Sequence, residues 1–268
     1  MLIAQITDLH VCPPGQLAFG VIDTAAALAR TVDTLLRLEP RPDMVLVTGD
    51  LAFDGQPAEY REIARQLGRL PMPVYAIPGN HDERGAWREV LGSRFSPTDH
   101  PAFIHYAVDL GPLRLVALDS IVPGSPSGEL CQERLDWLET QLARGAGKPA
   151  LVMLHHPPTA LGVGFMDATS CAGGERLKAV IERHPQVERV LCGHLHRPVT
   201  LRWAGTILSV APGTAHQIPL EIREGGPAGY NLEPPAFHLH CLVEGSGLVT
   251  HQIYLQSFAG PFPFAPRG

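Results

Sequence analysis

Aspartate, asparagine and histidine side chains occur together at five places where an aliphatic run of the chain ends. The five segments are Asp8-x-His10, Gly49-Asp50, Gly79-Asn80-His81-Asp82, His155-His156-Pro157 and Gly193-His194-x-His196. They offer oxygen and nitrogen donors without any thiolate, a donor set that divalent transition metals accept. The candidate ligands are Asp8, His10, Asp50, Asn80, His155, His194 and His196. These are too many for one tetrahedral zinc ion and suit two metals that share a bridging carboxylate.

Taken one at a time, each segment also has an ordinary structural explanation. A Gly-Asp pair after a strand is usually a turn, an aspartate often caps a loop, and paired histidines often pack in a core. The segment from Gly79 to Asp82 is the most specific, because it places three ligand-capable groups in one tight glycine turn. Because five such segments follow five successive predicted strands, we favour one common site over separate coincidences.

The charge of such a cluster indicates its substrate. Two divalent ions carry four positive charges, and two aspartates with a bridging hydroxide return three, which leaves about +1. A site of that charge attracts a phosphodiester monoanion. Two ions ~3.5–4 Å apart can bind phosphoryl oxygens and hold a metal-bound hydroxide in line for attack. His81 adjoins the cluster but lies outside the ligand count, so we predict that it stabilises charge or donates a proton to the leaving oxygen.

Strands must position these segments, and the hydrophobic pattern predicts where they are. Aliphatic runs predict strands at 2–6, 44–48, 74–77, 150–154 and 187–192, each ending at one of the five segments. Amphipathic helices are expected between them, for example after an Asp23 cap and from Pro57 as first helical residue. Alternating strands and helices predict an α/β fold, in which functional sites lie beyond the carboxyl ends of the strands.

Hairpins interrupt this alternation around Gly111-Pro112, around Ala204-Gly205 and near the C-terminus around Glu244-Gly245-Ser246-Gly247. The expected class is therefore α/β with α+β character, a layered structure that ends in a C-terminal β-hairpin extension. We expect a catalytic domain over residues 1–211 and a C-terminal extension or cap over residues 212–268. The Pro-rich end, 260–268, is expected to be loose.

Composition argues against several classes of protein. The 268 residues are 45% hydrophobic, enough for a full core, and no stretch approaches the ~20 apolar residues of a membrane helix. The first residues have no basic segment ahead of an apolar run, so no signal peptide is predicted. Five cysteines without a CxxC pair favour a reducing compartment, and we expect a cytoplasmic protein. A net charge of −6 argues against a nucleic acid partner.

The five segments together resemble the signature of the calcineurin-like metallophosphoesterases. Further segments are similar to the branch of that family with bacterial glycerophosphodiesterases and class III cyclic-nucleotide phosphodiesterases. These segments are Phe19-Gly-x-Ile22-Asp23, Gly55-x-Pro57-x-Glu59-Tyr60, Trp137-Leu138 and Pro212-Gly213-Thr214-x-His216-Gln217. The resemblance covers roughly residues 1–260 and implies a four-layer αββα sandwich with a dinuclear centre.

The resemblance also assigns a role to each matching residue. One metal would be held by Asp8, His10, Asp50 and His196, and the other by Asp50, Asn80, His155 and His194, with Asp50 bridging. Substrate would contact Asn80 and His81, with His81 near the leaving group, and Phe19 and His216 would line the mouth of the pocket. His156 would be a supporting or structural residue. The family implies a homodimer or higher homo-oligomer, to which the C-terminal hairpin would contribute.

Two positions depart from the family pattern. Arg197 follows a candidate ligand where a small or polar residue is usual; it would either contact phosphate and extend the range to monoesters or point to solvent. Cys131 stands at an expected helix N-cap, where Ser, Thr or Asp is preferred.

The leading hypothesis is a dinuclear-metal phosphodiesterase that acts on small diesters, namely cyclic nucleotides such as cAMP or glycerophosphodiesters. The alternatives are a broad phosphomonoesterase or a nuclease of the same fold; the net charge and the presence of only Lys148 and Lys178 as lysines argue against a nuclease. A non-catalytic scaffold is disfavoured because all ligand positions are filled. Asp, His and Asn ligands leave iron, manganese, zinc and cobalt open as the metal.

Overall fold

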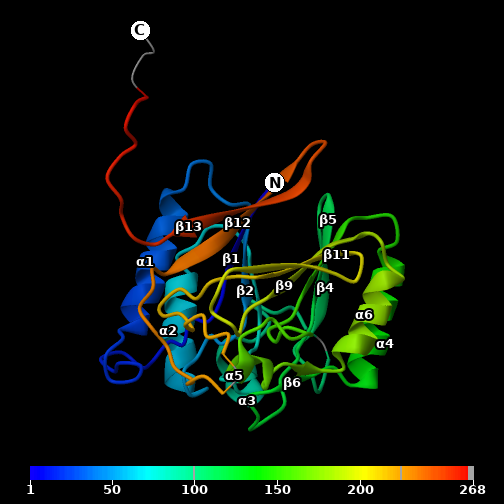
Figure 1. Ribbon diagram of the computed structural model, residues 1–268, viewed down its shortest axis with the longest axis horizontal. Helices are drawn as coiled ribbons and strands as arrows, with labels where there is room; N and C mark the ends of the chain where they lie inside the picture. The colour runs from blue at the N-terminus through cyan, green and yellow to red at the C-terminus, as the bar shows by residue number, and fades with distance from the viewer. Residues whose placement is uncertain (99, 224, 265–268) are drawn as a thin grey trace.

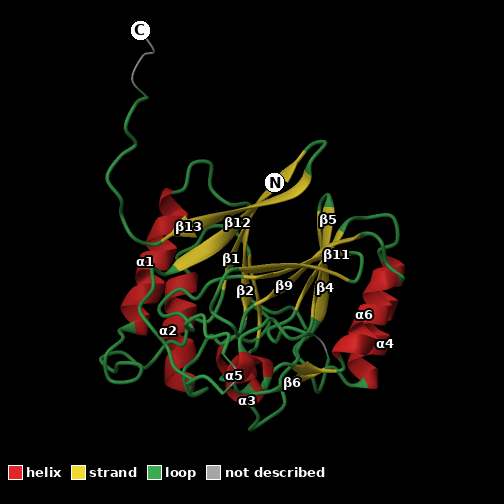
Figure 2. Cartoon of the chain, in the orientation of Figure 1, coloured by secondary structure: helices red, strands yellow, loops and turns green. Residues whose placement is uncertain are grey.

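Two β-sheets pack face to face, and helices cover the outer face of each sheet (Figures 1 and 2). The computed structural model describes residues 1–98, 100–223 and 225–264. The first sheet has the order β13-β12-β1-β2-β3 and the second β10-β11-β9-β7-β5-β4. This arrangement confirms the expected four-layer αββα sandwich.

The first sheet contains the three N-terminal strands and the last two. Its strands are β1 (Leu2–Ile6), β2 (Met44–Thr48), β3 (Val74–Ile77), β12 (Ala236–Val243) and β13 (Gly247–Tyr254). Strands β1, β2 and β3 run parallel, and β12 pairs antiparallel with β1. The helices on this side are α1 (Thr24–Arg37), α2 (Pro57–Leu67) and α3 (Arg84–Val90).

The second sheet has a parallel centre and hairpins at both edges. Its strands are β4 (Tyr106–Leu110), β5 (Leu113–Ala117), β7 (Ala150–Met153), β9 (Val187–Cys192), β10 (Val199–Trp203) and β11 (Thr206–Val210). Helices α4 (Gln132–Arg144) and α6 (Gly174–Glu182) cover it. The short helix α5 (Gly164–Asp167) and the two-stranded pair β6 (Gly128–Glu129) and β8 (Cys171–Ala172) lie in the loops.

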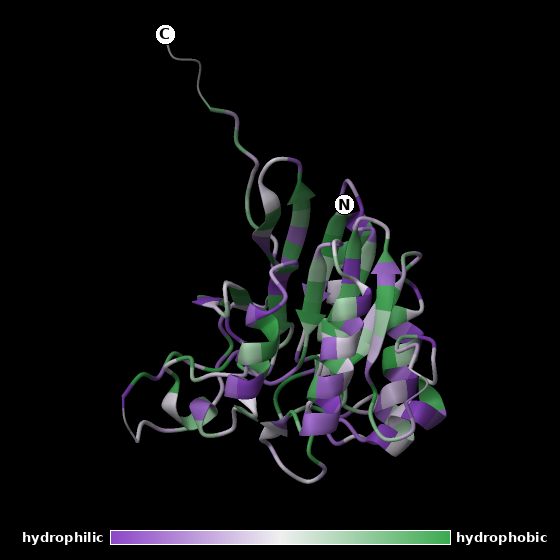
Figure 3. Cartoon of the chain, turned by 90° about the vertical axis from the view of Figure 1, so that its right-hand side faces the viewer, coloured by the Kyte–Doolittle hydropathy of each residue, from purple (hydrophilic) through white to green (hydrophobic). Residues whose placement is uncertain are grey.

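Three layers of buried side chains hold this sandwich together. One cluster fills the space between the first sheet and its helices, a second does the same for the second sheet, and a third, with Ile3, Leu46 and Leu151, lies between the sheets. Because the central strands are covered on both faces, they are continuous hydrophobic runs, which is why the sequence predicts them well. Figure 3 shows these hydrophobic strands between helices whose outer residues are hydrophilic.

Local signals explain where α1 and α2 begin. The Asp23 side chain accepts a hydrogen bond from Ala26 N at 2.8 Å, and Pro57 begins α2, as expected. Cys131 is the N-cap of α4 and makes no side-chain cap bond. The first strand of the hairpin expected around Gly111-Pro112 begins at Tyr106, and just before it His100 Nδ1 accepts from Phe103 N in a turn.

The C-terminal hairpin is part of the first sheet. Strand β12 pairs with β1 from Leu2 opposite Cys241 to Gln5 opposite His238, and Phe237 is fully buried in the core. Beyond β13 the chain projects away from the body (Figure 1), and Phe262 is exposed. The division between residues 211 and 212 stays a prediction, and the last part of the expected loose end, 265–268, lies outside the described residues. Among the described helices, none has the length and hydropathy needed to cross a bilayer.

Candidate metal centre

The seven candidate ligands meet at one edge of the sandwich, although they come from both sheets. Each follows the carboxyl end of β1, β2, β3, β7 or β9. All but Asn80, which is half-buried, have buried side chains. The fold therefore brings the candidate ligands together in one cluster, as the sequence led us to expect.

A first set of donors contains Asp8, His10, Asp50 and His196, whose ligand atoms lie within 4.8 Å of one another. His196 Nε2 lies 3.1 Å from His10 Nε2 and 3.3 Å from Asp8 Oδ1. His10 Nε2 lies 3.5 Å from Asp50 Oδ2. Two carboxylates and two imidazoles thus converge on one small volume.

A second set shares one atom with the first. Asp50 Oδ2 lies 3.4 Å from His155 Nε2 as well as facing His10. Asn80 Oδ1 lies 3.2 Å from His155 Nε2 and 3.0 Å from His194 Nδ1. The same carboxylate oxygen therefore stands between two groups of donors, as a bridging ligand requires.

Hydrogen bonds on the far side of three rings orient their donors. The Nδ1–H groups of His155 and His196 donate to the carbonyls of Thr48 at 2.8 Å and His216 at 3.2 Å. The Thr169 hydroxyl donates to a backbone carbonyl, so its oxygen accepts from His194 Nε2 at 3.0 Å. In each ring the other nitrogen is left with its lone pair toward the cluster, which is how proteins prepare histidines for metal.

Three of the candidate ligand rings, those of His10, His194 and His196, are in the protonation state that fits a cation, whereas His155 with its pKa raised to about 9 must first lose a proton. Burial lowers the pKa of His10 well below its usual value, that of His196 to about 4 and that of His194 to about 3, so these rings are neutral at pH 7. Burial alone would raise the pKa of Asp50, but the charges of His155 and His81 hold it well below normal. Neutral imidazoles around an ionised carboxylate are the donor state that divalent metals need.

The backbone at the cluster adopts a conformation that few L-residues adopt. The φ angles are +54° at Asp8, +44° at His10, +51° at Asp50, +69° at His194 and +47° at His196. Such left-handed residues cost free energy and persist where the surrounding structure imposes them, which is typical of functional sites. No sequence signal predicted this feature.

Two glycines allow the loops to approach this closely. A Cβ at Gly49 would lie 2.3 Å from His155 Nδ1, and a Cβ at Gly79 would lie 2.2 Å from Asp50 Oδ1. Asp82 then ties the loops together, because its carboxylate accepts from the backbone N–H groups of Leu51 at 3.0 Å and Gly79 at 2.9 Å. Asp82 belongs to the Gly79 segment, but the sequence did not indicate that its carboxylate connects the two loops.

His81 stands beside the cluster with one ring nitrogen free. Its Nδ1–H donates to the Phe53 carbonyl at 2.7 Å, and its backbone N–H donates to Asp50 Oδ1 at 2.9 Å. Burial alone would lower the pKa of His81, but the charge of Asp50 and the Phe53 carbonyl outweigh it and raise the pKa. The ring therefore holds a proton more tightly than a free imidazole, and it lines the pocket next to the donors.

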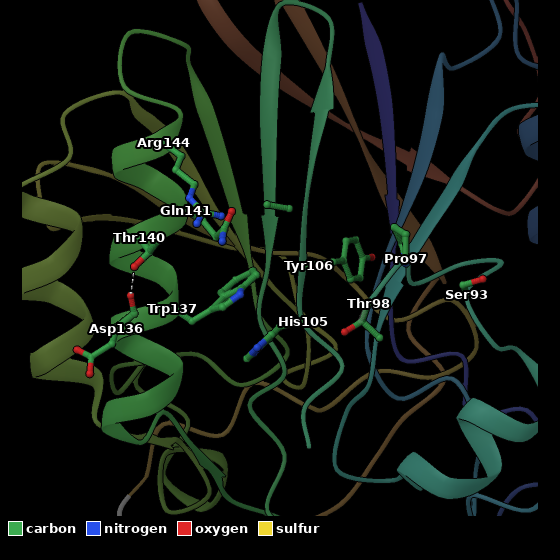
Figure 4. A pocket seen from close by; sticks show the side chains of 11 residues that line it. Ser93, Pro97, Thr98, His105, Tyr106, Asp136, Trp137, Thr140, Gln141 and Arg144 are labelled. Atoms are coloured by element: carbon green, nitrogen blue, oxygen red, sulfur yellow. Dashed lines mark hydrogen bonds between the residues drawn. The ribbon is translucent and has the colours of Figure 1, made fainter. Parts of the chain in front are cut away.

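A pocket of about 340 Å³ opens over the cluster. Both Phe19 and His216 line this pocket: His216 is buried against the ring of His196, and Phe19 is about half exposed. That they contact substrate stays a prediction. Tyr230, which no sequence pattern indicated, stacks its ring on Phe19 with centroids 4.4 Å apart. A larger cavity of about 790 Å³, between α4 and β4 and lined by Trp137 and His105, contains none of the candidate ligands (Figure 4).

His156 and Arg197 are next to candidate ligands in the sequence, but both make hydrogen bonds to groups outside the cluster. His156 Nδ1 lies 2.8 Å from Ser120 Oγ, and its Nε2 lies 3.2 Å from the Pro126 carbonyl, so both ring nitrogens have protein partners. Arg197 neither lines the pocket nor points freely to solvent. Its Nη1 donates to Glu233 Oε2 and to the Ile218 carbonyl, both at 2.7 Å.

Comparisons with known proteins agree with this geometry. The calcineurin-like phosphoesterase model matches residues 1–198. The chain is 35% identical to a probable glycerophosphodiester phosphodiesterase, GpdQ, of Arcobacter nitrofigilis, over 98% of this chain and 97% of that protein. It is 32% identical to the 3′,5′-cyclic adenosine monophosphate phosphodiesterase CpdA of Escherichia coli K12, over 80% of this chain and 76% of that protein.

Solved structures show the same fold. A dimetal phosphatase from Danio rerio superposes with a TM-score of 0.70 at 16% identity, covering 96% of this chain and 99% of that one. The extent of the sequence match and the clustered His and Asp donors support a dinuclear site for divalent metal ions. The chain belongs to the calcineurin-like phosphoesterase family.

Proposed function

We propose that this chain is a metal-dependent phosphodiesterase that hydrolyses small phosphodiesters, with cyclic nucleotides and glycerophosphodiesters as leading substrates. The observation that carries the proposal is the position of Asp50 Oδ2 between His10 Nε2 and His155 Nε2, at 3.5 and 3.4 Å. The names of the relatives, a glycerophosphodiester phosphodiesterase and a cyclic adenosine monophosphate phosphodiesterase, support the choice of substrate.

The donors divide between two metals as the family pattern implies. Asp8, His10, Asp50 and His196 would hold one ion, and Asp50, Asn80, His155 and His194 the other. When bound, two divalent ions supply Lewis-acid polarisation of phosphoryl oxygens and lower the pKa of a water molecule. Iron, manganese, zinc and cobalt all accept this donor set.

The protein's own residues contribute proton transfer and orientation. Hydrolysis forms a P–O bond from water and breaks the P–O bond to the alcohol, whose oxygen must gain a proton. His81 supplies that proton from Nε2, because its Nδ1–H is already committed to the Phe53 carbonyl. Asn80 lines the same pocket, and its amide N–H would donate to the phosphate.

The charges at the pocket favour a diester over a monoester. Among the described residues that line it, there is no lysine or arginine to meet the second negative charge of a monoester. Arg197, the nearest candidate by sequence, is paired with Glu233 instead. A scaffold role is disfavoured, because the ligand positions are filled and their donors converge.

Assembly and location complete the proposal. We infer a homodimer or higher homo-oligomer to which the C-terminal hairpin contributes, since β13 is an edge strand of eight residues with an exposed Tyr254. We infer a cytoplasmic location, which the five free cysteines favour. Stable binding to nucleic acid or to membranes is not part of the proposal.

Metal analysis with two chromogenic esters tests the enzyme. Purified protein should contain up to two transition metals per chain and should cleave bis(p-nitrophenyl) phosphate faster than p-nitrophenyl phosphate. A protein that takes up no metal and cleaves neither ester would refute the proposal, and faster cleavage of the monoester would replace it with a phosphomonoesterase. A panel of 3′,5′-cAMP, 2′,3′-cAMP and glycerophosphoethanolamine then ranks the natural diesters.

A further inference from the structure

Apolar side chains line the pocket together with the candidate ligands. They are Phe19, Pro126, Phe165, Met166, Ile218 and Tyr230. The volume of about 340 Å³ is that of a small-ligand site. An ester group attached to a phosphate on the cluster must therefore lie against apolar side chains.

The aromatic pair of Phe19 and Tyr230 is held firmly although it is partly exposed. The rings of Phe19 and Tyr230 stack at 4.4 Å with an angle of 20°, and Phe19 also packs edge-on against Phe53 at 5.2 Å. Phe19 has φ +52° in a turn closed by the hydrogen bond from Ala18 N to Ile22 O at 2.9 Å. These contacts fix the loop near the N-terminus against the segment that follows residue 212.

Tyr230 is fixed from its own side of the mouth. Its neighbour Asn231 exchanges backbone hydrogen bonds with Gln217, at 2.9 and 3.0 Å. About half of the Phe19 surface and 37% of the Tyr230 surface remain accessible. A rigid, half-exposed aromatic pair at the entrance offers a face or an edge to a flat ligand at little entropic cost.

The mouth offers little to a charged or hydroxylated group. Apart from Asp50 and the histidines, no ionisable side chain other than the Tyr230 phenol is found among the described lining residues. The Thr169 hydroxyl already donates to the Met166 carbonyl and accepts from His194. An ammonium headgroup would therefore find no carboxylate at this entrance, and glycerol hydroxyls would find few partners.

We propose that Phe19 and Tyr230 form a subsite that stacks on a flat, uncharged aromatic group of the substrate, so that nucleoside and aryl phosphodiesters are preferred to glycerol-based diesters. This inference rests on the proposed phosphodiesterase function and selects between its two substrate classes. Tyr230 is the specificity-determining residue, because it has no part in holding metal.

Two phosphodiesters and adenosine, a nucleoside without phosphate, test the subsite. The manganese-loaded protein is assayed with bis(p-nitrophenyl) phosphate and with glycerophosphoglycerol, which has no ring, and adenosine is used as a competitive inhibitor. Tyr230→Leu should lower the ratio of kcat/KM for the aryl ester to kcat/KM for glycerophosphoglycerol about 2- to 10-fold, mainly through a higher KM for the aryl ester. A loss of that size corresponds to the interaction energy of one aromatic pair. It should also weaken inhibition by adenosine.

Two further variants separate stacking from general damage. Tyr230→Phe keeps the ring and should recover most of the discrimination that Tyr230→Leu loses. Phe262→Leu removes an exposed aromatic ring in the segment that follows β13, and it should leave the ratio unaltered. If the wild type is active and Tyr230→Leu leaves both the ratio and the inhibition unchanged, the subsite is refuted while the phosphodiesterase stands. If the loaded wild type cleaves neither diester, the proposed function fails, and the subsite with it.

Discussion

His10 Nε2 and His196 Nε2 face each other at 3.1 Å, although 186 residues separate them in the chain. His196 donates through Nδ1 to the His216 carbonyl, so its Nε2 presents a lone pair to the neighbouring ring. Two buried nitrogens so close, with Asp8 and Asp50 beside them, form a site that is short of positive charge. A divalent cation between these groups would supply the missing charge.

Removing bound metal should destabilise the protein. The buried carboxylates of Asp8 and Asp50 lose their cations, and the left-handed backbone at both residues keeps its strain. A chelator should therefore lower the Tm measured by calorimetry, and added Mn²⁺ should restore it. A Tm that is indifferent to both treatments would contradict the assignment of the cluster.

Asn80→Ala should weaken one metal site and spare the other. Asn80 Oδ1 faces only His155 and His194, whereas the first set of donors does not include it. The measured metal content should fall from two ions toward one per chain, and the rate of diester hydrolysis should fall with it. Loss of both metals at once would show that the two sets do not act separately.

His81→Ala should leave the metal content intact and slow turnover. General acid catalysis contributes about 10²- to 10⁴-fold, and the loss should be largest for esters whose leaving alcohol is a poor leaving group. A p-nitrophenyl ester needs little proton donation, so it serves as the internal control. Equal losses on alkyl and p-nitrophenyl esters would assign His81 to binding and not to proton transfer.

Gly79→Ala should damage the centre by crowding alone. The added Cβ would lie 2.2 Å from Asp50 Oδ1 and 2.4 Å from Asp50 N, and neither can move without displacing the shared ligand. We expect a loss of about 1–3 kcal/mol in the free energy of unfolding and weaker metal binding. The matched control is Gly164→Ala, where a Cβ meets nothing within 4 Å. Equal behaviour of the two variants in denaturant titration would refute the close approach.

Metal affinity should fall as pH falls from 9 to 6. Burial alone would lower the pKa of His155, but the charge and hydrogen bond of Asp50 raise it to about 9, and burial raises the pKa of Asp8 to about 7. Each group must lose a proton to bind its own metal, so the affinity of the site with His155 weakens about tenfold per pH unit below pH 9. The affinity of the site with Asp8 weakens about tenfold per unit below pH 7. His194, with a pKa of about 3, adds nothing in this range. Competition with a chelator at pH 6, 7 and 8 measures the slope, and a flat profile would contradict it.

The amino-acid sequence by itself determined the candidate ligands and the strands that carry them. Strands β1, β2, β3, β7 and β9 are buried on both faces, so each is a short aliphatic run whose end is visible without a structure. The loops that follow contain the donors within a few residues, because ligands at strand ends need no long connection. The layered architecture followed from alternation and from the family resemblance.

Only the tertiary structure decided how those residues are used. That Asp50 Oδ2 is shared, that His156 is occupied by Ser120 and that Arg197 pairs with Glu233 all depend on side-chain direction. These directions depend on left-handed backbone angles and on contacts between segments far apart in the chain, and neither leaves a local pattern. Tyr230 was missed for the same reason, because its partner Phe19 lies near the other end of the chain and their stacking exists only once the two loops meet.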